Sequence, residues 1–124
     1  MAGPSPSPED YCVERILLVD DNGVVRGIAR EIIADAGYEV TDVASAAEAL
    51  AWARQHESFD ILITDLVMPD VDGLDLAAAM KGINRSVRVL YTSGYVDMSW
   101  TGSFLAKPYT RAELVKAIDE LVAA

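Results

Sequence analysis

The stretch that most constrains the fold is residues 61–73, which read ILITDLVMPDVDG. Residues 61–64 are apolar or β-branched with no alternating polar residue, which is typical of a strand buried on both faces of a parallel sheet. Asp65 follows directly, and Pro69 and Gly73 mark the loop that carries the chain away. Ligands bind open α/β sheets at the carboxyl ends of the strands. Asp65 is therefore a candidate reactive or metal-binding carboxylate, although a single aspartate here could instead cap a turn.

Strand and helix patterns alternate along the rest of the chain. Apolar periodicity, capping boxes at Ser45 with Glu48 and at Thr110 with Glu113, and a helix stop at Gly37 define the helices. Strands are predicted over residues 15–19, 38–43, 59–64, 87–91 and 103–106, and helices over 23–36, 45–55, 74–80 and from 110 to the end. Because alternating strands and helices imply right-handed crossovers, we expect a doubly wound α/β fold with a five-stranded parallel sheet.

Polar side chains follow four of these strands, at the edge that parallel strands share. The set is Asp20 and Asp21, Asp65, either Thr92 or Ser93, and Lys107. Three crowded carboxylates repel one another, which favours a hard divalent cation such as Mg²⁺. A lysine and a hydroxyl beside them could hold a phosphoryl group. Each residue alone has a plain structural interpretation, such as a helix cap or a solvated charge, but together they favour a phosphoryl-transfer site.

Charge and composition narrow the classes of partner. The formal net charge of −10 and scattered Lys and Arg argue against a nucleic-acid interface, and no apolar run approaches the roughly 20 residues of a membrane span. Cys12 is the single cysteine, so no internal disulfide forms and a reducing cytoplasm is expected. Residues 1–13 contain the Pro/Ser-rich run GPSPSPED and are predicted to be a disordered tail before one domain over residues 14–124.

The motifs LLVDDN, TDLVMPDVDG, TSGY and FLAKPY, in this order, resemble the receiver domain of two-component response regulators. The resemblance covers about residues 15–123 and implies a sheet of order 2-1-3-4-5, the flavodoxin-like order of the chemotaxis receiver. It implies that Asp65 accepts a phosphoryl group and that Asp20 and Asp21 hold Mg²⁺, Asp21 more directly than Asp20. The main-chain carbonyl of Val67 would complete the protein ligands, and Lys107 would pair with the phosphoryl group.

The resemblance also implies a conformational switch. Ser93 is expected to be its hydroxyl residue because the small Gly94 follows, with Thr92 as the alternative, and Phe104 matches its rotating aromatic residue. One departure lies in residues 95–103, YVDMSWTGS, where only nine residues stand in place of a complete fourth helix and the approach to the fifth strand. A helix of three turns needs about 11 residues, so we expect the family's fourth helix to be missing or reduced. Met98 and Trp100 would then pack over the opened sheet or bind a partner.

The expected function is that of a phosphorylatable receiver, not an enzyme, acting as a single-domain response regulator or as the receiver of a hybrid histidine kinase. Its partners would be a sensor histidine kinase or a histidine phosphotransfer protein, and a downstream protein. Two other classes stay open. One is an interaction module that works without phosphorylation. The other is a small Mg²⁺-dependent phosphatase, which is weakened because Val67 stands where a general acid would be needed.

Overall fold

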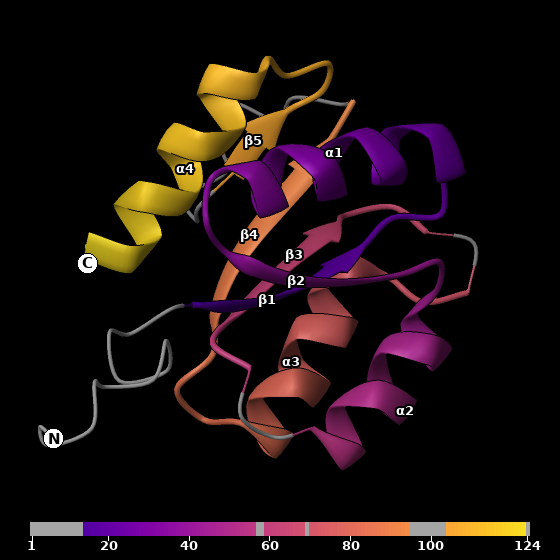
Figure 1. Ribbon diagram of the computed structural model, residues 1–124. Helices are drawn as coiled ribbons and strands as arrows, with labels where there is room; N and C mark the ends of the chain where they lie inside the picture. The colour runs from indigo at the N-terminus through magenta and orange to yellow at the C-terminus, as the bar shows by residue number, and fades with distance from the viewer. Residues whose placement is uncertain (1–13, 57–58, 69, 95–103, 124) are drawn as a thin grey trace, which may run out of the picture.

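The computed structural model describes residues 14–56, 59–68, 70–94 and 104–123 (Figure 1). Within these residues the elements are β1 (Arg15–Val19), α1 (Gly23–Asp35), β2 (Glu39–Val43), α2 (Ala46–Gln55), β3 (Ile61–Asp65), α3 (Gly73–Ile83), β4 (Arg88–Ser93), β5 (Phe104–Ala106) and α4 (Arg111–Ala123). All strand pairs are parallel, in the order β2-β1-β3-β4-β5. The doubly wound fold and its strand order are therefore confirmed.

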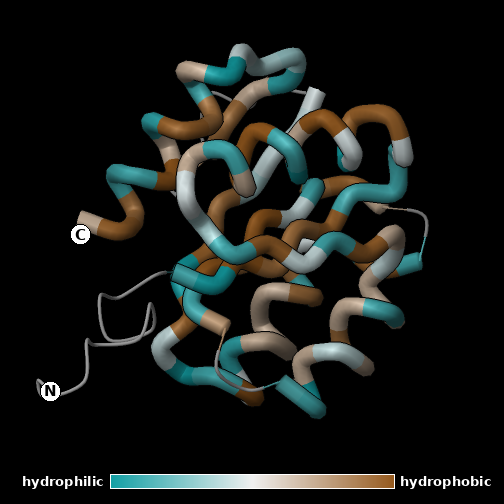
Figure 2. The backbone as a smooth tube through the Cα atoms, in the orientation of Figure 1, coloured by the Kyte–Doolittle hydropathy of each residue, from teal (hydrophilic) through white to brown (hydrophobic). Residues whose placement is uncertain are grey.

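Helices cover both faces of the sheet, α1 and α4 on one side and α2 and α3 on the other (Figure 1). Figure 2 shows hydrophobic residues concentrated in the central strands between the two helix layers. Alternate residues of the central strands feed two separate cores, because successive strand residues point to opposite faces. Leu17 and Leu62 belong to the core under α2 and α3, and Ile16 and Ile63 to the core under α1 and α4.

Helix ends follow the predicted capping chemistry with one difference. The backbone N–H of Glu113 donates to Thr110 Oγ1 over 3.1 Å and that of Thr110 donates to Glu113 Oε1 over 2.8 Å, so this capping box is reciprocal. Glu48 instead accepts from the backbone N–H of Ala44, one residue before the expected Ser45. Gly37 ends α1 with φ of +98°, a left-handed conformation that glycine adopts without a Cβ clash.

Several predicted boundaries were wrong, and two of them lie at the carboxyl edge of the sheet. Asp65 is the last residue of β3 and not the residue after it, because it pairs with Thr92 of β4. For the same reason β4 extends through Ser93, which pairs with Ala106 of β5. Helix α3 covers Gly73–Ile83 and is longer than predicted at both ends; Asp72 caps its start by accepting from the Leu74 N–H over 2.7 Å.

Arg88, the first residue of β4, joins the two ends of the described chain. Its Nη1 donates to the carbonyl of Leu121 over 2.9 Å, near the end of α4. Its Nη2 pairs with the carboxylate of Glu14, which is buried just before β1. The start of the first strand and the end of the last helix are thus held at the amino edge of the sheet.

Two predictions fall on parts of the chain that lie outside the described residues. One is the disordered tail at residues 1–13, with Cys12. The other is the missing or reduced helix at residues 95–103, with Met98 and Trp100; the described residues contain four helices. In the described ranges, no helix is long and apolar enough to cross a bilayer.

Candidate functional site

Three aspartates meet at the carboxyl edge of the sheet. Asp20 and Asp21 follow β1, and Asp65 ends β3, the neighbouring strand. Each offers one carboxylate oxygen, and these oxygens all lie within 4.8 Å of one another. Asp20 and Asp65 are buried, with exposed fractions of 2% and 9%, whereas Asp21 is exposed. The sheet therefore concentrates negative charge at one point that opens to solvent.

Lys107 supplies the positive charge of the site. Its Nζ donates to Asp20 Oδ2 over 2.8 Å and to Asp65 Oδ2 over 3.1 Å. The backbone N–H of Lys107 donates to the carbonyl of Ser93 over 2.7 Å, which fixes the start of the side chain beside β4. The peptide bond from Lys107 to Pro108 is cis.

Burial and the ion pairs act together on the protonation of the site. Burial raises the pKa of Asp65, and the negative charges of Asp20 and Asp21 raise it further, while the hydrogen bond and charge of Lys107 oppose the rise without cancelling it. Burial alone would lower the pKa of Lys107, but its hydrogen bonds to Asp20 and Asp65 and their negative charges together outweigh burial, so the pKa lies above its usual value. Lys107 therefore stays charged, and Asp65 is a more basic carboxylate than an exposed aspartate.

Close packing of α3 against β3 sets the position of Asp65. The N–H of Gly73 donates to the carbonyl of Leu66 over 2.9 Å. A Cβ atom at residue 73 would lie 2.2 Å from the carbonyl oxygen of Asp65 and 2.9 Å from Leu66 Cα. Only glycine lets the helix approach the end of β3 this closely. From the sequence Gly73 was predicted only to mark a loop, so this contact was missed.

The other predicted site residues lie around this cluster. Thr92 and Ser93 are both buried at the end of β4, and Thr92 is the register partner of Asp65, so both hydroxyl assignments stay open. Phe104 begins β5 beside Tyr91, with its side chain partly buried. Val67 lies two residues past Asp65, and its side chain is exposed.

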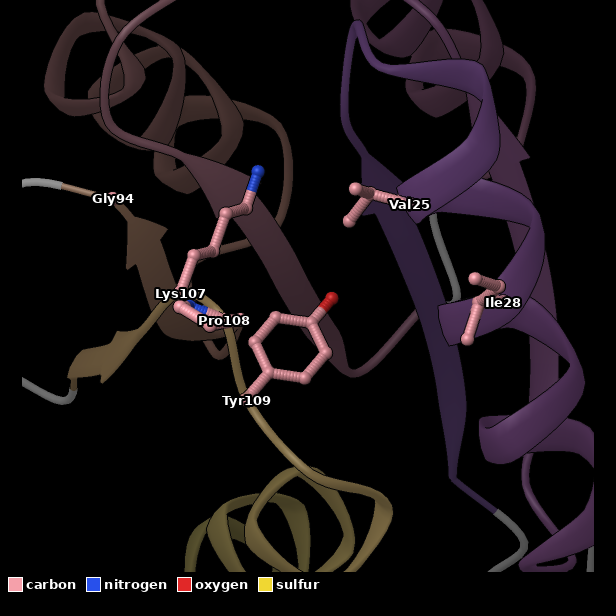
Figure 3. Close-up of a pocket in the computed structure, with 6 residues that line it drawn as sticks. All are labelled: Val25, Ile28, Gly94, Lys107, Pro108 and Tyr109. Atoms are coloured by element: carbon pink, nitrogen blue, oxygen red, sulfur yellow. The ribbon is translucent and has the colours of Figure 1, made fainter.

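A pocket of about 500 Å³ adjoins Lys107 on the side away from α2 and α3. The described residues that line it are Val25, Ile28, Gly94, Lys107, Pro108 and Tyr109. Figure 3 shows Val25 and Ile28 on α1 facing the ring of Tyr109 across this space, with the Lys107 side chain extending past its upper end. The lining is largely apolar, so the edge of the sheet has an acidic centre and an apolar flank.

The three carboxylates fit a magnesium ion by their chemistry. Mg²⁺ binds oxygen ligands, usually one or two carboxylates together with water and substrate phosphate oxygens. Asp20, Asp21 and Asp65 offer such oxygens close together, and the exposed Asp21 leaves room for water on the solvent side. Lys107 neutralises part of the charge but leaves an excess of negative charge for a cation.

Arg26 is a residue of this region that the sequence did not single out. It lies in the first turn of α1. In the structure its Nη1 donates to the backbone carbonyl of Asp20 over 2.8 Å. Its other partner, Asp42, stands 16 residues away, so no local pattern could have revealed the contact.

Comparisons with known proteins agree with this geometry. Residues 16–119 match the family model described as "Response regulator receiver domain". The chain is 30% identical to the response regulator receiver protein CpdR of Brucella abortus, over 90% of this chain and 99% of that protein. It is 28% identical to the sensor kinase CckA of the same organism over 86% of this chain, but spans only 12% of that kinase. The solved receiver domain from the hybrid histidine kinase CckA superposes with a TM-score of 0.79 at 33% identity, covering 87% of this chain and 98% of that one.

Proposed function

Because this chain belongs to the response regulator receiver family, we propose that Asp65 accepts a phosphoryl group from a phosphohistidine of a partner protein. The single observation that carries the proposal is the contact of Lys107 with both Asp20 and Asp65 at the acidic edge. It joins a nucleophile, a fixed cation and a set of metal-ligand oxygens in one place, which are the parts that phosphoryl transfer needs.

In the proposed reaction, a carboxylate oxygen of Asp65 attacks the phosphorus atom in line with the leaving histidine nitrogen. An O–P bond forms to give an acyl phosphate, and the N–P bond breaks with its electron pair returning to the imidazole. Mg²⁺ bound by Asp20, Asp21, Asp65 and the Val67 carbonyl would neutralise charge on the phosphoryl oxygens. Lys107 keeps its charge because its pKa is raised, so it can pair with the phosphoryl group on the Asp65 side.

We propose that the hydroxyl of Ser93, or alternatively of Thr92, then donates to a phosphoryl oxygen. Both side chains are buried at the end of β4, next to the strand that carries Asp65. A shift of the end of β4 would also move Phe104, because β5 pairs with β4 from Tyr91 onward. This gives a route from the phosphorylated edge to a protein-binding surface.

The surroundings of the site favour a protein as the phosphoryl donor. Val24 and Ile28 on α1 are 73% and 56% exposed, and Val67 beside Asp65 is also exposed. Exposed apolar side chains around a charged centre suit docking of another protein surface. The donor would be a sensor histidine kinase or a histidine phosphotransfer protein in the cytoplasm. The chain would serve either as a single-domain regulator or as the receiver of a hybrid kinase.

The proposal is tested by phosphorylating the protein with acetyl phosphate or phosphoramidate and measuring intact mass. We expect one phosphoryl adduct that requires Mg²⁺ and is lost in Asp65→Asn. Asp75→Asn is the matched control, since Asp75 is an exposed aspartate in the first turn of α3. If the folded protein gives no adduct with these donors or with a phosphohistidine protein, the hypothesis of an interaction module that works without phosphorylation is favoured instead.

A further inference from the structure

Arg26 connects the acidic edge to the neighbouring strand. Its Nη1 donates to the backbone carbonyl of Asp20 over 2.8 Å, and its Nε donates to Asp42 Oδ2 on β2 over 3.1 Å. The side chain starts from the first turn of α1 and reaches the connection between β1 and α1 at the Asp20 carbonyl. One guanidinium group thus links α1, the end of β1 and β2.

The carbonyl that Arg26 binds belongs to the peptide unit between Asp20 and Asp21. The orientation of this unit determines how the two carboxylates are directed relative to each other. Two further hydrogen bonds act on the same segment: the N–H of Asp20 donates to the Val43 carbonyl over 3.2 Å, and that of Asn22 donates to Asp20 Oδ1 over 2.9 Å. Arg26 adds a charged donor to the carbonyl oxygen, which makes the hydrogen bond stronger than a neutral one.

Arg26 is itself held in place. Asp42 accepts from Arg26 at Oδ2 and also forms an ion pair with Arg30, whose Nε lies 2.9 Å from Asp42 Oδ1. The side chain of Arg26 is 22% exposed, against 54% for Arg30. A planar guanidinium group with fixed donors loses little freedom in such a bridge, whereas a lysine could not reach both partners in the same way.

Arg30 provides a natural comparison: within the described residues it shares Asp42 with Arg26, but only Arg26 donates to the Asp20 carbonyl. Removing either arginine takes one positive charge from the same carboxylate. If charge alone mattered, each removal would leave the acidic edge more negative and would strengthen cation binding. If orientation mattered, only the loss of Arg26 would weaken it.

We propose that Arg26, held by Asp42, is a positioning residue that orients the Asp20–Asp21 pair for Mg²⁺. This inference rests on the metal site of the proposed function. Residues that orient metal ligands without touching the ion commonly change metal affinity by about 10- to 100-fold when they are replaced.

The test is a calorimetric titration of the unphosphorylated full chain with Mg²⁺. We expect Arg26→Met to weaken Mg²⁺ binding about tenfold. Arg30→Met should bind Mg²⁺ as tightly as the unchanged protein or more tightly. Equal or tighter binding by a folded Arg26→Met protein would overturn the inference.

A second measurement needs no metal. Hydrogen exchange of the Asp20 and Asn22 backbone amides, followed by NMR without Mg²⁺, should become faster in Arg26→Met and stay unchanged in Arg30→Met. If the unchanged protein binds no Mg²⁺, the metal part of the proposed function fails. The exchange rates of the two amides still test whether Arg26 orders the segment, and unaltered rates in Arg26→Met would refute its role. If Arg26→Met does not fold, Asp42→Asn replaces it in both experiments. We then expect a smaller loss of Mg²⁺ affinity and of amide protection, and an Asp42→Asn protein that loses neither would contradict the inference.

Discussion

The ammonium group of Lys107 donates to Asp65 Oδ2 over 3.1 Å, across 42 residues of sequence. The same group donates to Asp20, so two buried carboxylates share one cation. Before any ligand binds, the site is thus an ion-paired cluster in which Lys107 occupies part of the space around the carboxylate oxygens.

Replacing Lys107 with methionine should change two properties of the site in opposite directions. Phosphorylation of Asp65 should slow by at least about tenfold because the cation that pairs with the phosphoryl group is lost. Mg²⁺ should bind several times more tightly, since the carboxylates lose a competing positive charge. Without Mg²⁺ the free energy of unfolding should fall by about 3 kcal/mol, because Asp20 loses the partner of its buried charge.

Lys116→Met, at an exposed position of α4, is the control for the Lys107 variant. If Lys107→Met lost Mg²⁺ affinity together with phosphorylation rate, this account would be contradicted.

Gly73→Ala should destabilise the protein and impair phosphorylation. The new Cβ would meet the Asp65 carbonyl oxygen at 2.2 Å, so α3 or the end of β3 must move. We expect a cost of about 2 kcal/mol in urea unfolding, together with slower phosphorylation at saturating Mg²⁺. Gly82→Ala in the same helix has no atom within 4 Å of the added Cβ and should be neutral or stabilising. Similar effects of both changes would show that the close approach at Gly73 is unimportant.

Tyr38→Phe should show a stability effect that depends on pH. The Tyr38 hydroxyl donates to Asp119, and burial, followed by this hydrogen bond and the charge of Asp119, raises the pKa of Tyr38 to about 12. Below the ordinary tyrosine pKa of about 10 the hydrogen bond is intact in the folded state, and we expect Tyr38→Phe to cost about 1 kcal/mol.

Above pH 10 the unfolded chain releases this proton while the folded protein retains it, so the contribution of Tyr38 declines as the pH rises toward 12. The difference in unfolding free energy between the two proteins, measured by urea unfolding at pH 7, 9 and 10.5, should shrink only at the highest pH. A constant difference would argue against the hydrogen bond as its cause.

Arg88→Met should cost more stability than Arg111→Met. Arg88 pairs with the buried Glu14 and also binds the Leu121 carbonyl, so its removal leaves a buried charge and a helix end without their donor. Arg111 pairs with Asp35 where both side chains are exposed. We expect a loss of about 2 kcal/mol for Arg88→Met and less than about 0.5 kcal/mol for Arg111→Met in thermal or urea unfolding. Losses of equal size would contradict the ranking by burial.

The sequence predicted the strand order through a resemblance and the strands themselves through their apolar runs. The run at residues 61–64 is buried on both faces, so its uniformly apolar or β-branched composition directly indicates a central strand of the sheet. The grouping of Asp20, Asp65 and Lys107 was also predictable, because parallel strands direct their carboxyl ends to one edge. In each case the signal is local or follows from topology.

The sequence did not reveal contacts that depend on how elements approach one another. Whether Gly73 is a turn residue or a packing requirement depends on the distance between α3 and β3. Arg26 looks like any polar residue of a helix, and its role depends on Asp42, a residue of a different element. The extension of β4 through Thr92 and Ser93 likewise depends on pairing with β3 and β5, which their own polar side chains do not indicate.

The contacts of Arg88 have a consequence for anything attached to this domain. They hold the start of β1 and the end of α4 together, and Figure 1 shows both on the same side of the molecule. Arg88 pairs in register with Ile61, four residues before Asp65, so roughly 13 Å of strand separate this anchorage from the acidic edge. A domain attached at either end would therefore be joined at the edge of the sheet opposite Asp65, and the acidic site would stay accessible to a histidine of a partner protein. An effect of the proposed phosphorylation on such a domain would have to pass along the strands and α4.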